Sequence, residues 1–242
     1  AGVGSAGAGQ IHDLVARPGL ACVKKHARAV IAVAGPAILT NLASPLAIAF
    51  MTRIIAQFGE AAVAASAIID RVVPLAFGGV FALTGAVGPI LGQNWGALRF
   101  DRMRRAFKDS LIFVIAYVSL VWIILLIARE LIVRLFGVAD LTADLVRVFT
   151  IWSGPTWLFM GFLFVANSAF NNLGFPFYAT LFNWGRATFG TIPFAVAGAW
   201  LGGPQGALIG FAAGVALFGV FSVLVAWKCI ARLEARPRPG AP

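Results

Sequence analysis

A few charged side chains fall inside long apolar runs of this sequence, where they could bind a solute or an ion. Asp70 and Arg71 stand side by side in AIIDRVVPLAF, and Arg186 lies in a later apolar run. An ionisable group in a membrane is costly and usually faces a bundle interior or a wet cavity. Adjacent helical residues point about 100° apart, so Asp70 and Arg71 do not pair directly and each needs a partner elsewhere. For Asp70, the alternatives are Arg186 and a water-filled cavity.

Amide side chains in the apolar runs add further hydrogen-bonding groups. Asn183 precedes Arg186 by three residues and therefore shares a helix face with it. The candidate cavity or substrate-binding residues are Asn41, Asp70, Arg71, Asn167, Asn183 and Arg186. For the amides, the alternative is hydrogen bonding between packed helices. For Arg186, the alternatives are a solute pathway and a structural role at a helix kink.

The histidines and cysteines have no spacing typical of a catalytic or metal site. His12 and His26 lie outside the apolar runs, and neither has a partner at metal-ligand spacing. No Ser-His-Asp or Cys-His arrangement suggests a nucleophile. We therefore expect no enzymatic activity, no metal site and no bound cofactor.

The apolar runs are long enough to cross a membrane. The chain has 242 residues, of which 60% are hydrophobic and 12% charged, and its mean hydropathy is +0.91. Soluble domains carry about 25% charged residues, and a span needs about 18 apolar residues. The expected spans are residues 28–56, 61–93, 109–128, 145–171, 177–201 and 205–228. Because these runs are continuous, unlike the short alternating strands of a barrel, we predict an all-α membrane protein with six transmembrane helices.

Basic residues cluster at alternate ends of the apolar runs, which predicts the topology. They concentrate up to residue 28, in the block 98–109 and from residue 228 onward, so the positive-inside rule places both termini in the cytoplasm. The net charge is +10. Because the basic residues lie at the ends of the apolar runs and do not form one basic face, we expect no nucleic-acid partner. We expect a cytoplasmic linker with a short amphipathic helix over residues 1–28, a six-helix lobe over 29–231 and a cytoplasmic tail over 232–242. For the amphipathic helix, a soluble linker helix is the alternative.

Breaker residues mark the ends and the packing of the expected helices. We expect breaks at 58–61, 98–109, 129–144, 172–177 and 201–206. Glycines at four-residue spacing, Gly88 with Gly92 and Gly206 with Gly210 and Gly214, predict close helix packing. The alternatives are packing within the chain and a dimer interface. Prolines inside the runs predict kinks, and the carbonyls that they release need other partners in lipid.

Two stretches resemble one family of transporters. AVAASAIIDRVVPLAF followed by GPILGQNWGALRFDRMRRAF is similar to the second and third helices of half of a MATE (multidrug and toxic compound extrusion) transporter. The motif residues are Gly92, Gln93, Asn94 and Gly96. SAFNNLGFPFYATLFNWGRATFGTIPFAVAG resembles a later loop and helix of the same half. The resemblance covers about residues 35–233 and implies a twelve-helix protein of two six-helix lobes around a central cavity, with this chain as the C-terminal lobe.

The resemblance also implies an activity. Members of the family are secondary active antiporters that export cationic or amphipathic drugs in exchange for H⁺ or Na⁺ by alternating access. The implied location is the bacterial inner membrane. The implied partners are membrane lipid, small cationic or amphipathic substrates, and either an N-terminal six-helix half or a second copy of the chain.

One departure from the family affects the coupling ion. Some members carry coupling carboxylates in the first and fourth helices of the second half, but here the first run has no acid before Glu60 and the fourth has none. We therefore expect the ion site in the other half, as in a second group of members. Two alternatives to drug export remain: a lipid or polysaccharide flippase of the same superfamily, and a truncated, non-transporting membrane fragment.

Overall fold

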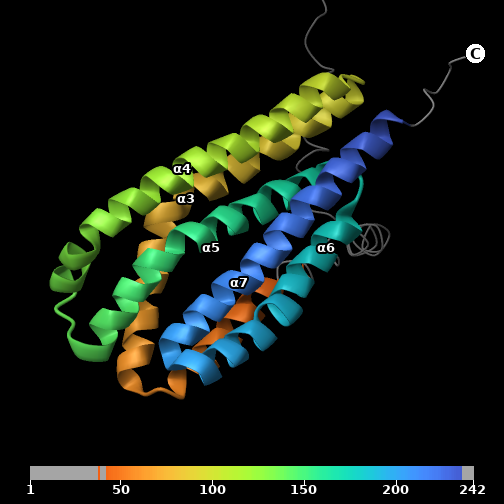
Figure 1. Ribbon diagram of the computed structural model, residues 1–242. Helices are drawn as coiled ribbons and strands as arrows, with labels where there is room; N and C mark the ends of the chain where they lie inside the picture. Colours follow the sequence, from red (N-terminus) through yellow and green to blue (C-terminus); the bar gives the residue numbers. More distant parts are fainter. Residues whose placement is uncertain (1–37, 39–41, 236–242) are drawn as a thin grey trace, which may run out of the picture. The chain divides into compact units, whose positions relative to one another are not determined.

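The computed structural model describes residue 38 and residues 42–235 (Figure 1). The chain divides into two units, Ala1–Leu39 and Thr40–Pro242, and every helix below belongs to the second unit. Several expectations lie outside the described residues: Asn41, the beginning of the span expected over 28–56, the linker over 1–28 and most of the tail over 232–242.

The described chain is built from helices joined by short turns. The elements are Leu42–Ala56, α3 (Glu60–Gly96), α4 (Phe100–Leu135), α5 (Asp140–Asn172), α6 (Pro176–Gly185), the π-helix η1 (Arg186–Gly190) and α7 (Ile192–Glu234). No strand occurs within the described ranges. The predicted all-α fold is therefore confirmed, with the pattern of a bundle whose neighbouring helices run up and down.

α7 contains two passes rather than one. Gly202 (φ −145°, ψ 23°) and Gly203 (φ 59°, ψ −145°) leave the helical conformation, and the positive φ of Gly203 is one that glycine adopts readily. The backbones of Gly198 and Gly206 touch, although eight residues of continuous helix would separate them by about 12 Å. The chain therefore reverses at Gly202–Gly203 (Figure 1), and the last two expected spans are separate helices.

Glycines form the seam between these two passes. The facing backbones are those of Gly190 with Gly214, Phe194 with Gly210, and Gly198 with Gly206. A methyl group added at Gly210 or Gly214 would meet a carbonyl group of the other pass. The predicted close packing is therefore confirmed as packing within the chain.

Two charged blocks that we expected to interrupt the chain are mostly helical. α4 begins at Phe100 and ends at Leu135, so the expected span 109–128 is too short at both ends. The prediction of long breaks at 98–109 and 129–144 is wrong, because the turns occupy only residues 97–99 and 136–139. Arginine, lysine and alanine favour helix, and their charge is compatible with a helix that extends beyond the lipid. α7 likewise continues to Glu234, past the expected lobe boundary at residue 231.

Aromatic contacts hold the bundle together around α5, which packs against α3, α4 and α7. Phe77 of α3 stacks on Trp157 of α5 with ring centroids 4.8 Å apart. Phe107 of α4 meets Trp227 of α7 edge-on at 5.1 Å. Such pairs add about 0.5–1.5 kcal/mol beyond the burial of their apolar area, so they stabilise the contacts between these helices.

The outside of the bundle is apolar as well. Ile127 on α4 is 80% exposed and Leu75 on α3 is 86% exposed, and many other large aliphatic side chains point outward. Four helical segments of the described chain are long and apolar enough to cross a membrane, and Leu42–Ala56 is a shorter apolar helix. One of the four, Pro176–Glu234, includes the reversal at Gly202–Gly203. An apolar surface of this extent is typical of a lipid-facing bundle.

Candidate functional site

α3 bends about two turns after the charged pair Asp70 and Arg71. Its backbone leaves helical geometry at Phe77 (φ −109°, ψ 15°), three residues after Pro74. The hydroxyl of Tyr117 on α4 donates to the carbonyl of Ala76 at 2.9 Å and accepts from the N–H of Gly79 at 3.2 Å. Tyr117 therefore satisfies both backbone groups beside the bend, which keeps the bend in one place.

α5 also contains a proline, and the carbonyl that this proline releases is bonded by a side chain of α4. Pro155 has no N–H, so the carbonyl of Ile151, four residues earlier, loses its helical hydrogen bond. The indole Nε1 of Trp122 donates to that carbonyl at 3.0 Å and to the carbonyl of Thr150 at 3.2 Å. The predicted need for replacement donors at prolines is therefore met here by a tryptophan side chain.

Asp70 and Arg71 lie on the exposed surface of the lobe. Neither makes an ion pair or a hydrogen bond through its side chain to another described residue. The interpretation that Arg186 pairs with Asp70 is wrong, because the guanidinium of Arg186 turns to a different helix. Whether the face with Asp70 borders a solute cavity stays a prediction.

Arg186 is buried in the bundle, with 3% of its surface exposed, and it opens the π-helix η1. Its Nη2 donates to the Ser44 hydroxyl on helix Leu42–Ala56 at 3.1 Å, while its Nε has no hydrogen-bond partner among the described residues. Thr191 donates to the Arg186 carbonyl at 3.0 Å and so satisfies the widened turn. π-Turns within helices are frequent at functional sites, and an unpaired buried N–H can receive an acceptor from a solute.

The two described amides among the candidates are also buried. The Nδ2 of Asn183 donates to the Ala179 carbonyl of its own helix at 2.9 Å. The Oδ1 of Asn167 has no partner among the described residues. The structure therefore sorts the described candidates into a buried set, Asn167, Asn183 and Arg186, and an exposed pair, Asp70 and Arg71.

The motif residues Gly92, Gln93, Asn94 and Gly96 lie at the end of α3, directly before its turn to α4. The N–H of Leu98 donates to the Trp95 carbonyl at 2.9 Å, and that of Arg99 donates to the Asn94 carbonyl at 2.8 Å. Gly92 lies beside Asn172 of α5, and the side chain of Asn94 donates to the Ile90 carbonyl at 2.8 Å. In this lobe the motif ends one helix and seats it against α5.

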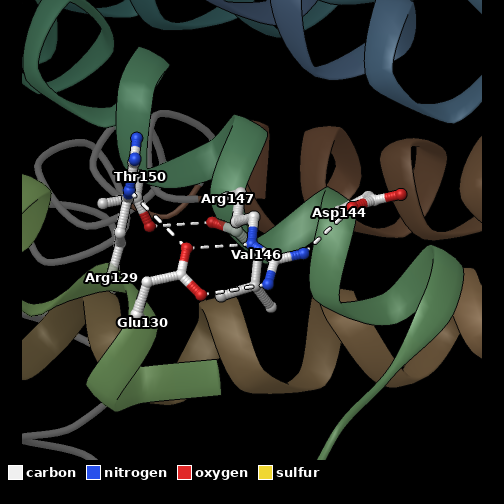
Figure 2. Close-up of polar contacts among 6 residues, drawn as sticks. All are labelled: Arg129, Glu130, Asp144, Val146, Arg147 and Thr150. Atoms are coloured by element: carbon white, nitrogen blue, oxygen red, sulfur yellow. Dashed lines mark hydrogen bonds and ion pairs between the residues drawn. The ribbon is translucent and has the colours of Figure 1, made fainter. Parts of the chain in front are cut away.

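An ion-pair cluster at the other end of α4 was not anticipated from the sequence. Figure 2 shows Glu130 of α4 facing Arg147 of α5, with Arg147 Nε 3.0 Å from Oε1 and Nη2 3.0 Å from Oε2. Arg147 Nη1 also donates to Asp144 at 3.1 Å, and Arg129 lies 3.7 Å from Glu130. The sequence did not indicate these ion pairs. Glu130 and Asp144 lie on opposite sides of the turn at residues 136–139, so only the packing of α4 against α5 brings both of them to Arg147.

A metal site in the described part of the chain would need several ligating side chains close together. No group of three or more histidine, cysteine, aspartate or glutamate side chains suited to a metal ion occurs there. The donor set around Arg186 is also cationic and neutral rather than anionic. The expectation that the coupling-ion site lies in the other half stays a prediction.

Comparison with known proteins places this geometry in a family. The sequence matches the MatE family over residues 36–197. A protein of Shewanella oneidensis described as an FAD transporter is 26% identical over 207 residues, which are 84% of this chain and 45% of that protein. An uncharacterized 21 kDa protein of Pseudomonas savastanoi is 39% identical over 119 residues, 49% of this chain and 39% of that protein.

The fold agrees with that assignment. The MATE transporter VcmN of Vibrio cholerae, solved in its bent form, superposes with a TM-score of 0.79 at 24% identity, over 88% of this chain and 48% of that one. This chain thus spans about half, or less, of the length of the relatives that it matches. Together, the sequence match, the six-helix lobe and its apolar surface show that this chain belongs to the MatE family of integral membrane proteins.

Proposed function

We propose that this chain is one lobe of a secondary active antiporter that exports amphipathic organic molecules, cationic drugs among them, in exchange for H⁺ or Na⁺ by alternating access. The observation that carries the proposal is the match of this six-helix lobe to one half of MATE transporters, with a TM-score of 0.79. Internal repeats of this kind place a substrate site at the interface between the repeats. The second lobe is a six-helix half of the same protein or a second copy of this chain.

Asp70 supports a cationic substrate. It is the one carboxylate well inside an apolar run among the described residues, and it is exposed on α3 without a partner there. A carboxylate next to water that has no basic partner attracts a cation, and the low dielectric of the surrounding lipid strengthens that attraction. Both features suit a group that meets an organic cation.

Export of a cationic dye tests the proposal. In cells that express the complete gene, we expect Asp70→Asn to slow ethidium efflux at equal expression, and Asp109→Asn, an exposed carboxylate exchanged in the same way, to leave it unchanged. Collapsing the proton and sodium gradients separately identifies the coupling ion. Unchanged efflux in Asp70→Asn would remove the cationic assignment, and efflux that ignores both gradients would remove the antiport mechanism.

An anionic solute is the second candidate, and two observations favour it. The buried Arg186 has no carboxylate partner among the described residues, and the Shewanella oneidensis relative is described as an FAD transporter. A guanidinium pairs well with a phosphate group. Efflux of FAD, followed by its fluorescence, distinguishes the candidates: an anionic substrate requires Arg186, whereas a cationic one requires Asp70.

A further inference from the structure

The two ends of the bundle treat their charged residues differently. The balanced end comprises residues 53–60, 129–147 and 200–204, which hold four bases and four acids. Two bases, Arg129 and Arg147, and two acids, Glu130 and Asp144, form ion pairs there (Figure 2). The basic end comprises residues 94–109 and 228–235. Its bases are Arg99, Arg102, Arg104, Arg105, Lys108, Lys228 and Arg232, and its acids are Asp101, Asp109 and Glu234. Among the described residues of the basic end, only Arg104 takes part in an ion pair, with Glu234.

The turn between α3 and α4 holds part of this charge in a fixed position. Leu98 adopts φ 55°, and the backbone hydrogen bonds from Leu98 and Arg99 to the last turn of α3 close the connection. Both Arg99 and Arg102 are exposed. A turn with satisfied backbone groups presents its arginines with less freedom to lose than a loose loop would.

A hollow lies beside these arginines, where α4 begins and α7 ends. It has a volume of about 440 Å³ and is lined by Leu98, Arg99, Phe100, Asp101, Arg102 and Glu234. Arg104 neutralises Glu234, and Asp101 lies in the first turn of α4, where the positive end of the helix dipole offsets its charge. The hollow therefore offers two free guanidinium groups next to two apolar side chains.

We propose that this hollow binds the headgroup of an anionic phospholipid from the leaflet that surrounds the basic end. Arg99 and Arg102 face the headgroup phosphate, and Leu98 and Phe100 lie against its glycerol and upper acyl chain. Basic pockets at the end of transmembrane helices suit anionic headgroups, and arginine matches the geometry of a phosphate. The balanced end lacks this preference, because its four arginines are matched by four acids and two of the arginines, Arg129 and Arg147, are in ion pairs.

Lipid retention by the purified full chain tests the proposal. The chain in mild detergent is incubated with phosphatidylglycerol or phosphatidylcholine, and the bound lipid is measured by native mass spectrometry. We expect preferential retention of phosphatidylglycerol, and a loss of about fivefold for each arginine removed, so about 25-fold for Arg99→Gln/Arg102→Gln. Arg129→Gln/Arg134→Gln removes the same charge from the balanced end and should keep the preference.

Three outcomes would overturn the proposal. They are equal retention of the two lipids by the unmodified chain, an equal loss in both double variants, and displacement of phosphatidylglycerol by inorganic phosphate at the same concentration. The last outcome would assign the hollow to free phosphate. Salt gives a measurement that needs no variant: retention should fall as the Debye length shortens from about 10 Å to about 3 Å between 0.1 M and 1 M salt. Retention that ignores salt would also contradict the site.

Discussion

Arg186 is a buried charge whose few hydrogen bonds favour a role in solute binding over a role in stability. It makes one hydrogen bond to Ser44 and leaves Nε without a partner among the described residues. Taking an ion out of water is costly, and replacing a buried ionic group by an apolar one of similar volume is often neutral or stabilising. A guanidinium held in this way is therefore poor evidence for a stabilising role and better evidence for a role in solute binding.

We therefore predict that Arg186→Met separates the two roles. The variant should unfold at the same temperature as the unmodified protein or at a higher one, because it removes an unsatisfied buried N–H. Under the second candidate function, transport of an anionic solute such as FAD should fall at least tenfold. Thermal unfolding in detergent and efflux at equal expression measure the two effects. A large loss of stability with normal transport would assign Arg186 to the architecture of η1.

At the scale of elements, the bends of α3 and α5 depend on side chains of α4. Tyr117 bonds to both sides of the bend at Phe77, and Trp122 bonds to the carbonyl released by Pro155. Side chains of α4 thus stabilise the bent parts of both α3 and α5. In a membrane, water is absent beside such groups and cannot replace these bonds.

Removal of the Tyr117 hydroxyl should loosen the bend of α3. Tyr117→Phe leaves the Ala76 carbonyl and the Gly79 N–H unpaired, so we expect a loss of about 1–3 kcal/mol in the free energy of unfolding. Tyr178→Phe is the matched control, because its hydroxyl makes no hydrogen bond to another described residue. Equal stability of the two variants in a denaturant titration in mixed micelles would contradict a stabilising role of the Tyr117 hydroxyl at the bend of α3.

The glycine seam between the last two passes makes a second prediction for elements. Gly214→Ala places a methyl group against the carbonyl of Gly190, and overpacking of this kind costs about 1–3 kcal/mol. Gly85→Ala on α3 has free space around the new methyl group and should be neutral or stabilising by up to about 1 kcal/mol. The same unfolding titration compares them, and a harmless Gly214→Ala would argue against close contact of the two passes.

At the scale of the whole molecule, the central question is which face of the lobe meets water. Asp70 and Ile127 are both exposed, but the proposed function gives them different surroundings, a solvated cavity for Asp70 and hydrocarbon for Ile127. Exposure in one lobe does not distinguish these environments. Thiol chemistry does, because the reactive thiolate forms only where water can solvate it.

We predict that a cysteine at position 70 reacts and one at position 127 does not. In a Cys22→Ser/Cys229→Ser background, Asp70→Cys should be labelled by a membrane-impermeant maleimide in intact membranes, and Ile127→Cys should be labelled only after detergent treatment. Mass spectrometry of the labelled chain measures both. An unreactive Asp70→Cys in the complete protein would place that face against lipid and remove the solute cavity from α3.

The helical membrane fold could be predicted from the sequence because it follows from the composition and the length of the apolar runs. Neither depends on how the side chains pack. The sequence also predicted the close approach at Gly210 and Gly214, since only glycine permits it. It misplaced the ends of α4 because hydropathy reports where lipid ends, whereas Arg102 and Arg134 are good helix residues in water. The roles of Ser44, Tyr117 and Arg147 could not be predicted, because each bond joins residues brought together only by the tertiary fold.

The reversal at Gly202–Gly203 has a consequence for how the protein is made. With only two residues outside helical geometry, the passes that it joins have no loop long enough to let one wait in the bilayer for the other. We expect them to leave the translocon as a single unit. The strongly apolar final pass would then accompany the segment with Arg186 into the membrane, and that arginine would enter already shielded rather than alone.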